Sequence, residues 1–190
     1  MKIVRIIVDP TPTLYAIQFN EYEENELDRN FYFWNDSELL TEFFRENRGD
    51  LRGYNLFHNT NYSVEDAVSK TLNDAENLEN LLLDKAEDGN EDEFEILQTF
   101  FAQLDDIETK LYPLQKSKGK LHYNSWLRLY AIRIDKHLYV ITGGAIKLTK
   151  KMEQRDHTKA ELDKMEEVIR FLRSKQLINE DEFKRLELGI

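Results

Sequence analysis

Two apolar segments in the last third of the chain, separated by only two residues, constrain the fold most strongly. Residues 126–134 (WLRLYAIRI) and 137–142 (HLYVIT) are rich in the branched and aromatic side chains that favour strands. The short link at Asp135-Lys136 joins them tightly, as in an antiparallel hairpin. Gly143-Gly144 allows a tight turn or a bulge into a third strand at 145–149. The sequence therefore predicts a β-meander.

A second strand pair is expected at the beginning of the chain. Apolar residues recur through 3–8 and 13–19, and Asp9-Pro10-Thr11-Pro12 lies between these segments. Proline has no amide hydrogen to donate to a strand ladder, so this stretch reads as the hairpin connection.

Helical spacing of apolar residues predicts an antiparallel helix pair and further helices around it. Asn35-Asp36-Ser37 provides an N-cap for a short helix that ends before Gly49, and Ser63 with Asp66 resembles a capping box. The pair is expected over about 64–85 and 91–110, with a turn at Asp88-Gly89-Asn90. A capping box at Thr158 to Glu161 starts a helix that runs to about 175, and Asn179 caps a last short helix.

These elements predict an α+β protein. Its small antiparallel sheet, made of the N-terminal hairpin and the C-terminal meander, packs with the helix pair and a C-terminal helix. Residues 1–60 form an acidic region that either belongs to the same domain or stands apart, and residues 61–190 hold the remaining elements. The 190 residues suffice for one domain, alone or with an appendage.

Charge divides the chain into an acidic first part and a basic block. Residues 1–109 carry 8 Lys/Arg against 26 Asp/Glu, whereas residues 110–175 carry 16 against 7. A nucleic-acid-binding protein is usually basic as a whole, so the net charge of -11 argues against that class. The local basic block argues for it.

The basic block supplies the candidate functional residues. Arg128 and Arg133 lie at odd spacing on one expected strand and so face opposite sides, whereas Arg128 shares a face with Tyr130. Further cations follow the glycine pair. Such side chains bind phosphate oxygens and stabilise the charge that develops during phosphodiester cleavage. A neighbouring Tyr or His would move the proton of a 2′-hydroxyl. The catalytic candidates are Arg128, Tyr130, Lys147 and His157, and the RNA-binding candidates are Arg133, Lys150, Lys151 and Arg155.

Several features have plainer alternatives. The basic residues could instead pair with the acidic first part of the chain. His157 could be a simple exposed histidine. The aromatic run Phe31 to Trp34 is either part of the core or a partner site. Asp84 to Glu95 only partly matches a calcium-binding loop, because Ala86 stands where an oxygen ligand belongs. The histidines lack metal-ligand spacing, so we expect no metal and no cofactor.

The local amino-acid sequence of the basic block resembles that of the RelE/HigB family of toxins. The residues that carry this resemblance are Arg128-Leu129-Tyr130-Ala131-Ile132, then Leu138 to Lys147, then Thr149-Lys150-Lys151. The resemblance covers about residues 62–175, and residues 13–20 would supply the first strand. It implies an endoribonuclease that cleaves mRNA without a metal, often on the ribosome, and that an antitoxin protein neutralises.

The alternative is a non-enzymatic protein that binds another protein through the aromatic run and the acidic helices. The chain has no cysteine, which excludes disulfides and thiolate chemistry. No apolar run approaches the roughly 18 residues of a membrane span, and the first residues read as a strand, not as a signal peptide. We therefore expect a cytoplasmic protein.

Overall fold

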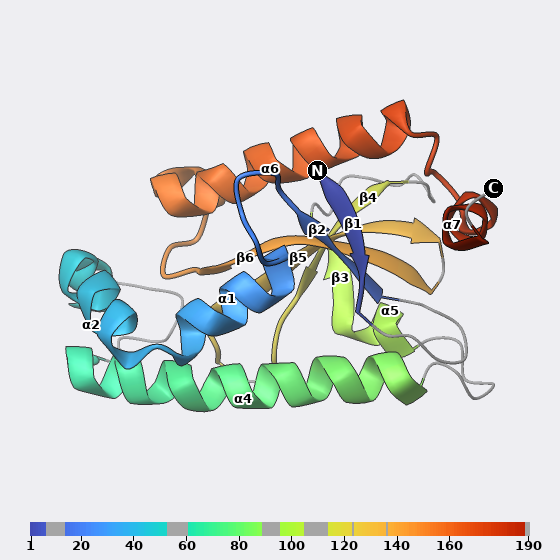
Figure 1. Ribbon diagram of the computed structural model, residues 1–190. Coiled ribbons are helices and arrows are strands. Elements are labelled where there is room, and N and C mark those ends of the chain that lie inside the picture. The colour runs from blue at the N-terminus through green and yellow to red at the C-terminus, as the bar shows by residue number, and fades with distance from the viewer. Residues whose placement is uncertain are drawn as a thin grey trace.

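The protein folds as α+β around one six-stranded sheet (Figure 1). The computed structural model describes residues 1–6, 14–52, 61–88, 96–104, 114–122, 124–135 and 137–188. The strand order is β1-β2-β6-β5-β4-β3. The strands are β1 (Lys2–Arg5), β2 (Leu14–Gln18), β3 (Phe101–Gln103), β4 (Gln115–Gly119), β5 (Leu127–Asp135) and β6 (Leu138–Ile146).

Helices cover both faces of the sheet and make three layers (Figure 1). One face carries α1 and α4, and the other carries α6. The helices are α1 (Glu26–Asn35), α2 (Ser37–Glu46), α3 (Arg48–Arg52), α4 (Val64–Asp88), α5 (Ile96–Phe100), α6 (Asp156–Ser174) and α7 (Glu180–Leu188), with a 3₁₀ turn, η1 (Met152–Gln154), before α6.

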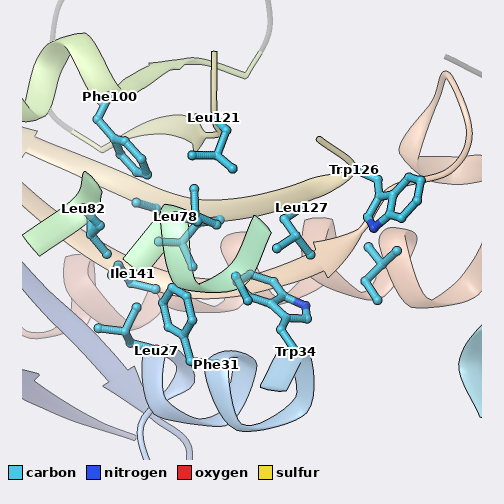
Figure 2. Packing of buried hydrophobic residues seen from close by; sticks show 14 of the residues in the cluster. Leu27, Phe31, Trp34, Leu78, Leu82, Phe100, Leu121, Trp126, Leu127 and Ile141 are labelled. Carbon is cyan, nitrogen blue, oxygen red and sulfur yellow. The ribbon is translucent and has the colours of Figure 1, made fainter. Parts of the chain in front are cut away.

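The alternation of side chains along the strands divides the core in two. On the α1/α4 face, Leu127 and Ile141 pack with Trp34 of α1 and Leu78 of α4 (Figure 2). On the α6 face, Tyr130, Ile132 and Val140 pack with Met165 and Leu172. Both faces of β5 and β6 are therefore buried, as expected for the central strands of a three-layer fold.

The sheet is mixed, whereas the sequence predicted an antiparallel one. The hairpin of β1 and β2 and the antiparallel pairs β5–β6, β4–β5 and β3–β4 are present, but β2 runs parallel to β6. The strand pattern of a segment does not encode its direction, and α1 to α5 lie in the chain between β2 and β6. The hairpin thus joins the same sheet as the meander.

The helix predicted over 91–110 is too long for the described part of that segment. It contains only α5, followed at once by β3, whose Phe101 pairs in register with Gly119 of β4. Phe100 and Phe101 are both buried, so packing and strand pairing outweigh the helical spacing. The turn at Gly89-Asn90 lies outside the described residues, as does the predicted connection at 9–12.

Two further differences concern the region around the meander. No strand was predicted between the helix pair and the meander, but residues 115–119 form β4, in which half-buried lysines alternate with buried Ser117 and Gly119. The predicted strand at 145–149 is not separate, because β6 runs through both glycines to Ile146. The bulge expected beside the glycines is present, as a register shift opposite Tyr130/Ala131.

Most predicted helix starts are confirmed. Asp36 accepts hydrogen bonds from two amides of α2, Ser63 and Asp66 cap α4 reciprocally, and Asn179 accepts from Glu182 in α7. Thr158 is the exception. Helix α6 begins at Asp156, so the Thr158 hydroxyl lies inside the first turn and donates to the carbonyls of Met152 and Arg155 instead of capping.

In the aromatic run, Phe31 and Trp34 belong to the buried core, whereas Tyr32 is 70% exposed on α1. Within the described segments, no helix combines the length and the apolar character needed to cross a membrane.

Candidate functional site

A cavity of about 640 Å³ lies where β4, β5 and the segment after β6 meet α6. We call it the basic pocket, because six of its lining side chains are cationic: Lys118, Lys120, Arg128, Lys147, Lys150 and Lys151. Glu153 is the one carboxylate among its described lining residues. Leu104, Tyr130, Met152 and Leu162 complete the wall.

Strand register brings part of this set together. Lys118 of β4 and Tyr130 of β5 are direct partners, so their side chains lie next to each other on the α6 face. Arg128 stands two residues before Tyr130 and projects from the same face. The sequence prediction that Arg128 and Tyr130 share a face is thus confirmed.

Lys147 organises the segment that follows β6. Its amide donates to the carbonyl of Trp126 at 2.8 Å, which keeps the chain beside β5. Its Nζ donates to the carbonyls of Thr149 at 2.7 Å and Lys150 at 2.5 Å. The loop that carries Lys150 and Lys151 is therefore folded around the ammonium group of Lys147.

Arg128 is held in a similar way. Its guanidinium donates to the carbonyls of Ser125 at 2.7 Å and Leu127 at 2.6 Å. Lys118 donates through Nζ to the carbonyl of Leu104 at 3.0 Å. These three cations are positioned by neutral carbonyls, and these contacts do not cancel their positive charge.

Cations outside the basic pocket behave differently. Lys116 pairs with Glu166 at 2.5 Å, Arg155 pairs with Asp50, and Lys164 bridges Glu26 and Glu161. Among the described residues, no such ion pair joins Lys118, Arg128 or Lys147 to a carboxylate. The idea that basic residues pair with the acidic first part therefore holds for Arg155 and Lys164, but not for these three.

Crowding of positive charge changes the acidity of Lys147. Burial, and then the charges of Arg128 and Lys118, lower its pKa to about 8. Burial also lowers the pKa of Arg128, which still remains charged. Lys147 is thus a pocket group that exchanges a proton near neutral pH.

Tyr130 forms the inner wall of the basic pocket. Its ring is 1% exposed, and its hydroxyl has no hydrogen-bond partner among the described residues. Burial raises the pKa of this phenol, Arg128 lowers it and Glu161 raises it further. The hydroxyl therefore stays protonated, as a buried donor that no described group uses.

Glu161 of α6 occupies the space above Gly143 on the same face of the sheet. A Cβ atom on Gly143 would lie 1.9 Å from its Oε2. The other oxygen, Oε1, accepts from Lys164 at 2.9 Å, while Oε2 has no partner among the described groups. Burial raises the pKa of Glu161 to about 7, and the ammonium group of Lys164 opposes that shift.

Three predicted site residues lie outside the basic pocket. Arg133 faces the opposite side of β5, where it donates to Gln98 at 2.7 Å and lies over the ring of Tyr139. Arg155 makes a two-pronged contact with Asp50. His157 lies against Phe43, with Nε2 3.0 Å from the carbonyl oxygen of Ile146. The other five, Arg128, Tyr130, Lys147, Lys150 and Lys151, converge.

Sequence reasoning missed Lys118 and Lys120. No strand was predicted for their segment, because residues 116–120 contain no apolar residue to signal one. The useful signal was the every-second-residue spacing of Lys116, Lys118 and Lys120, which places cations on one face if the segment is extended.

Comparisons with models of protein families, with curated proteins and with solved structures each returned no match.

Proposed function

We propose that this protein binds RNA in the basic pocket and cleaves it without a metal ion, as a RelE-like toxin of a toxin-antitoxin system. The observation that carries the proposal is the convergence of Arg128, Tyr130 and Lys147 in one pocket, where backbone carbonyls position Lys118, Arg128 and Lys147. The resemblance described above adds the expectations of ribosome-bound mRNA as substrate and of an antitoxin partner.

Phosphate binding follows from charge. Lysine and arginine side chains supply the contacts that hold nucleic-acid backbones, and the exposed Lys150 and Lys151 stand at the pocket's edge. Arg128 lies farther in and would stabilise the extra negative charge on the phosphate oxygens in the transition state.

Proton transfer follows from Lys147 and Tyr130. When Lys147 is neutral, its two N–H groups continue to donate to the carbonyls of Thr149 and Lys150, and its lone pair takes the 2′-hydroxyl proton. The 2′-oxygen then bonds to phosphorus as the bond to the 5′-oxygen breaks. The Tyr130 hydroxyl protonates that leaving oxygen. The products are a 2′,3′-cyclic phosphate and a 5′-hydroxyl, and solvent restores both side chains.

The test is binding and cleavage of an end-labelled RNA by the purified protein. We expect Lys150→Ala combined with Lys151→Ala to weaken binding about tenfold or more, because two phosphate contacts are lost. Lys159→Ala combined with Arg170→Ala removes the same charge from exposed positions of α6 outside the pocket and should leave binding within about twofold. Wild-type protein that neither binds nor cuts RNA would contradict the proposal.

A second candidate function is recognition of a basic protein segment by the opposite layer. Tyr32 stands 70% exposed in a hollow of about 380 Å³ between α1 and α4, which Asp28, Asp36 and Glu79 also line. Aromatic side chains with nearby carboxylates suit arginine or lysine of a partner. Co-purification of a protein partner without RNA would favour this candidate.

A further inference from the structure

The basic pocket concentrates more positive charge than a short piece of RNA backbone neutralises. Its volume of about 640 Å³ falls within the range typical of small-molecule sites. A phosphodiester strand brings one charge for each whole nucleotide, so a segment filling this volume brings few negative charges. Six cationic side chains and one carboxylate, Glu153, surround the same space among the described residues.

Part of this charge is fixed in place. Lys118, Arg128 and Lys147 come from β4, β5 and the end of β6, and each is tied to a backbone carbonyl. Burial, and then the charges of Arg128 and Lys118, lower the pKa of Lys147, so these neighbours oppose its positive charge. A ligand that places several negative charges within a few ångströms would relieve this repulsion.

The inner wall offers a specific contact in addition to charge. Tyr130, whose side chain is 1% exposed, lines the pocket, and its buried hydroxyl lacks a partner among the described residues. Phosphate oxygens only accept hydrogen bonds, which suits a donor of this kind. Leu104, Met152 and Leu162 add an apolar surface on which a sugar or base would rest.

We propose that the basic pocket also binds a polyphosphate group, in which phosphates are joined through single bridging oxygens, and that this ligand competes with RNA for the site. The competition rests on the proposed function, whereas the binding itself does not. The linked phosphates belong either to a nucleoside triphosphate or to inorganic polyphosphate. Only the nucleotide has a sugar and a base that could also contact the apolar wall.

The binding experiment is calorimetry on the full chain at about 0.15 M salt without divalent cations. The probes are inorganic phosphate, tripolyphosphate, AMP and ATP. We expect tripolyphosphate to bind at least about tenfold more tightly than phosphate, because three linked groups contact several cations at once. ATP tighter than tripolyphosphate identifies a nucleotide as the ligand, and equal or weaker ATP binding identifies inorganic polyphosphate.

Lys118→Ala and Lys116→Ala are a matched pair of variants. Both lysines lie on β4 and face α6, but Lys118 lines the pocket while Lys116 pairs with Glu166. Tripolyphosphate binding should weaken about tenfold in Lys118→Ala and stay within about twofold in Lys116→Ala. Equal effects of the two variants, or equal affinities for phosphate and tripolyphosphate, would overturn the proposal.

Competition separates this inference from the proposed function. Tripolyphosphate should displace labelled RNA from the wild-type protein at concentrations near its own dissociation constant. RNA binding that tripolyphosphate does not disturb would refute a shared site while leaving RNA recognition intact. Tripolyphosphate binding without any RNA binding would refute the RNA function and leave the polyphosphate site standing.

Discussion

At the scale of single residues, Lys147 is the group on which burial, neighbouring charge and hydrogen bonding act together. Two carbonyls accept from its Nζ, and two nearby cations oppose its charge. A lysine of ordinary pKa, near 10.4, is almost wholly protonated at neutral pH. A pKa of about 8 gives Lys147 an appreciable neutral fraction there, as a general base requires.

Lys147→Arg tests this role, because arginine keeps the positive charge and does not lose its proton. In the wild-type protein, kcat/KM for RNA cleavage should rise with pH up to about 8 and then level off, following the neutral form of Lys147. Lys147→Arg should retain RNA binding within a few-fold and lose about 10²-fold or more in cleavage. A flat pH profile, or an active arginine variant, would show that another group takes the proton.

At the scale of elements, local sequence patterns correctly predicted the features that depend on neighbouring residues, namely helix caps and helical spacing. The caps at Asp36, Ser63 and Asn179 and the spacing of α4 and α6 are set by neighbouring residues, and each prediction is confirmed. The opposite faces of Arg128 and Arg133 followed from strand alternation alone. Pairing between distant segments did not: the parallel β2–β6 contact and the short β3 against β4 depend on tertiary partners.

The site shows the same division. Five of the eight candidate residues converge, because the correctly predicted hairpin of β5 and β6 carries Arg128 and Tyr130 and leads directly into the segment of the other three. Arg155 and His157 were grouped with them because they are close in sequence. After the turn at η1, however, Arg155 contacts Asp50 of α3 and His157 contacts Phe43 of α2. The positive charge of a residue in the sequence does not show whether it will pair with a carboxylate, as Arg155 does, or be held by carbonyls, as Arg128 is.

The contact between α6 and β6 depends on a missing side chain at Gly143. Gly143→Ala places a Cβ where the Glu161 carboxylate stands, so we expect the free energy of unfolding to fall by about 1–3 kcal/mol. Gly49→Ala is the control. Gly49 lies in α3 with no atom within 4 Å of a new Cβ, and alanine there should stabilise by up to about 1 kcal/mol.

Urea unfolding of the single variants and of Gly143→Ala combined with Glu161→Ala measures the effect. The double variant should recover part of the loss, with a coupling of about 0.5–3 kcal/mol between the two positions. Additive losses would mean that the glycine is needed for another reason than room for Glu161.

At the scale of the whole molecule, the sheet lies between a basic pocket and an acidic hollow. The basic pocket opens on the α6 face, whereas the hollow lined by Asp28, Asp36 and Glu79 lies in the α1/α4 layer. The net charge of -11 therefore describes the molecule at long range and not the surface that a ligand meets. Which of the two governs polyanion binding depends on screening.

The Debye length is about 10 Å at 0.1 M salt, so repulsion from distant carboxylates is largely screened while contacts in the pocket are not. We therefore expect RNA affinity to fall as salt rises, although the protein is acidic. For a single strand, each phosphate contact makes the slope of log K against log salt more negative by about 0.7. A strand that places two or three phosphates in the basic pocket thus gives a slope between about -1.4 and -2.1.

Titrations of one RNA at several salt concentrations measure this slope. Lys118→Ala should reduce its magnitude by about 0.7, whereas Lys116→Ala, which removes a charge already paired with Glu166, should leave it unchanged. If the net negative charge governed binding, salt would screen repulsion and affinity would rise. A slope of zero or of positive sign would therefore assign any binding to contacts other than phosphates in the basic pocket, because only released counterions make the slope negative.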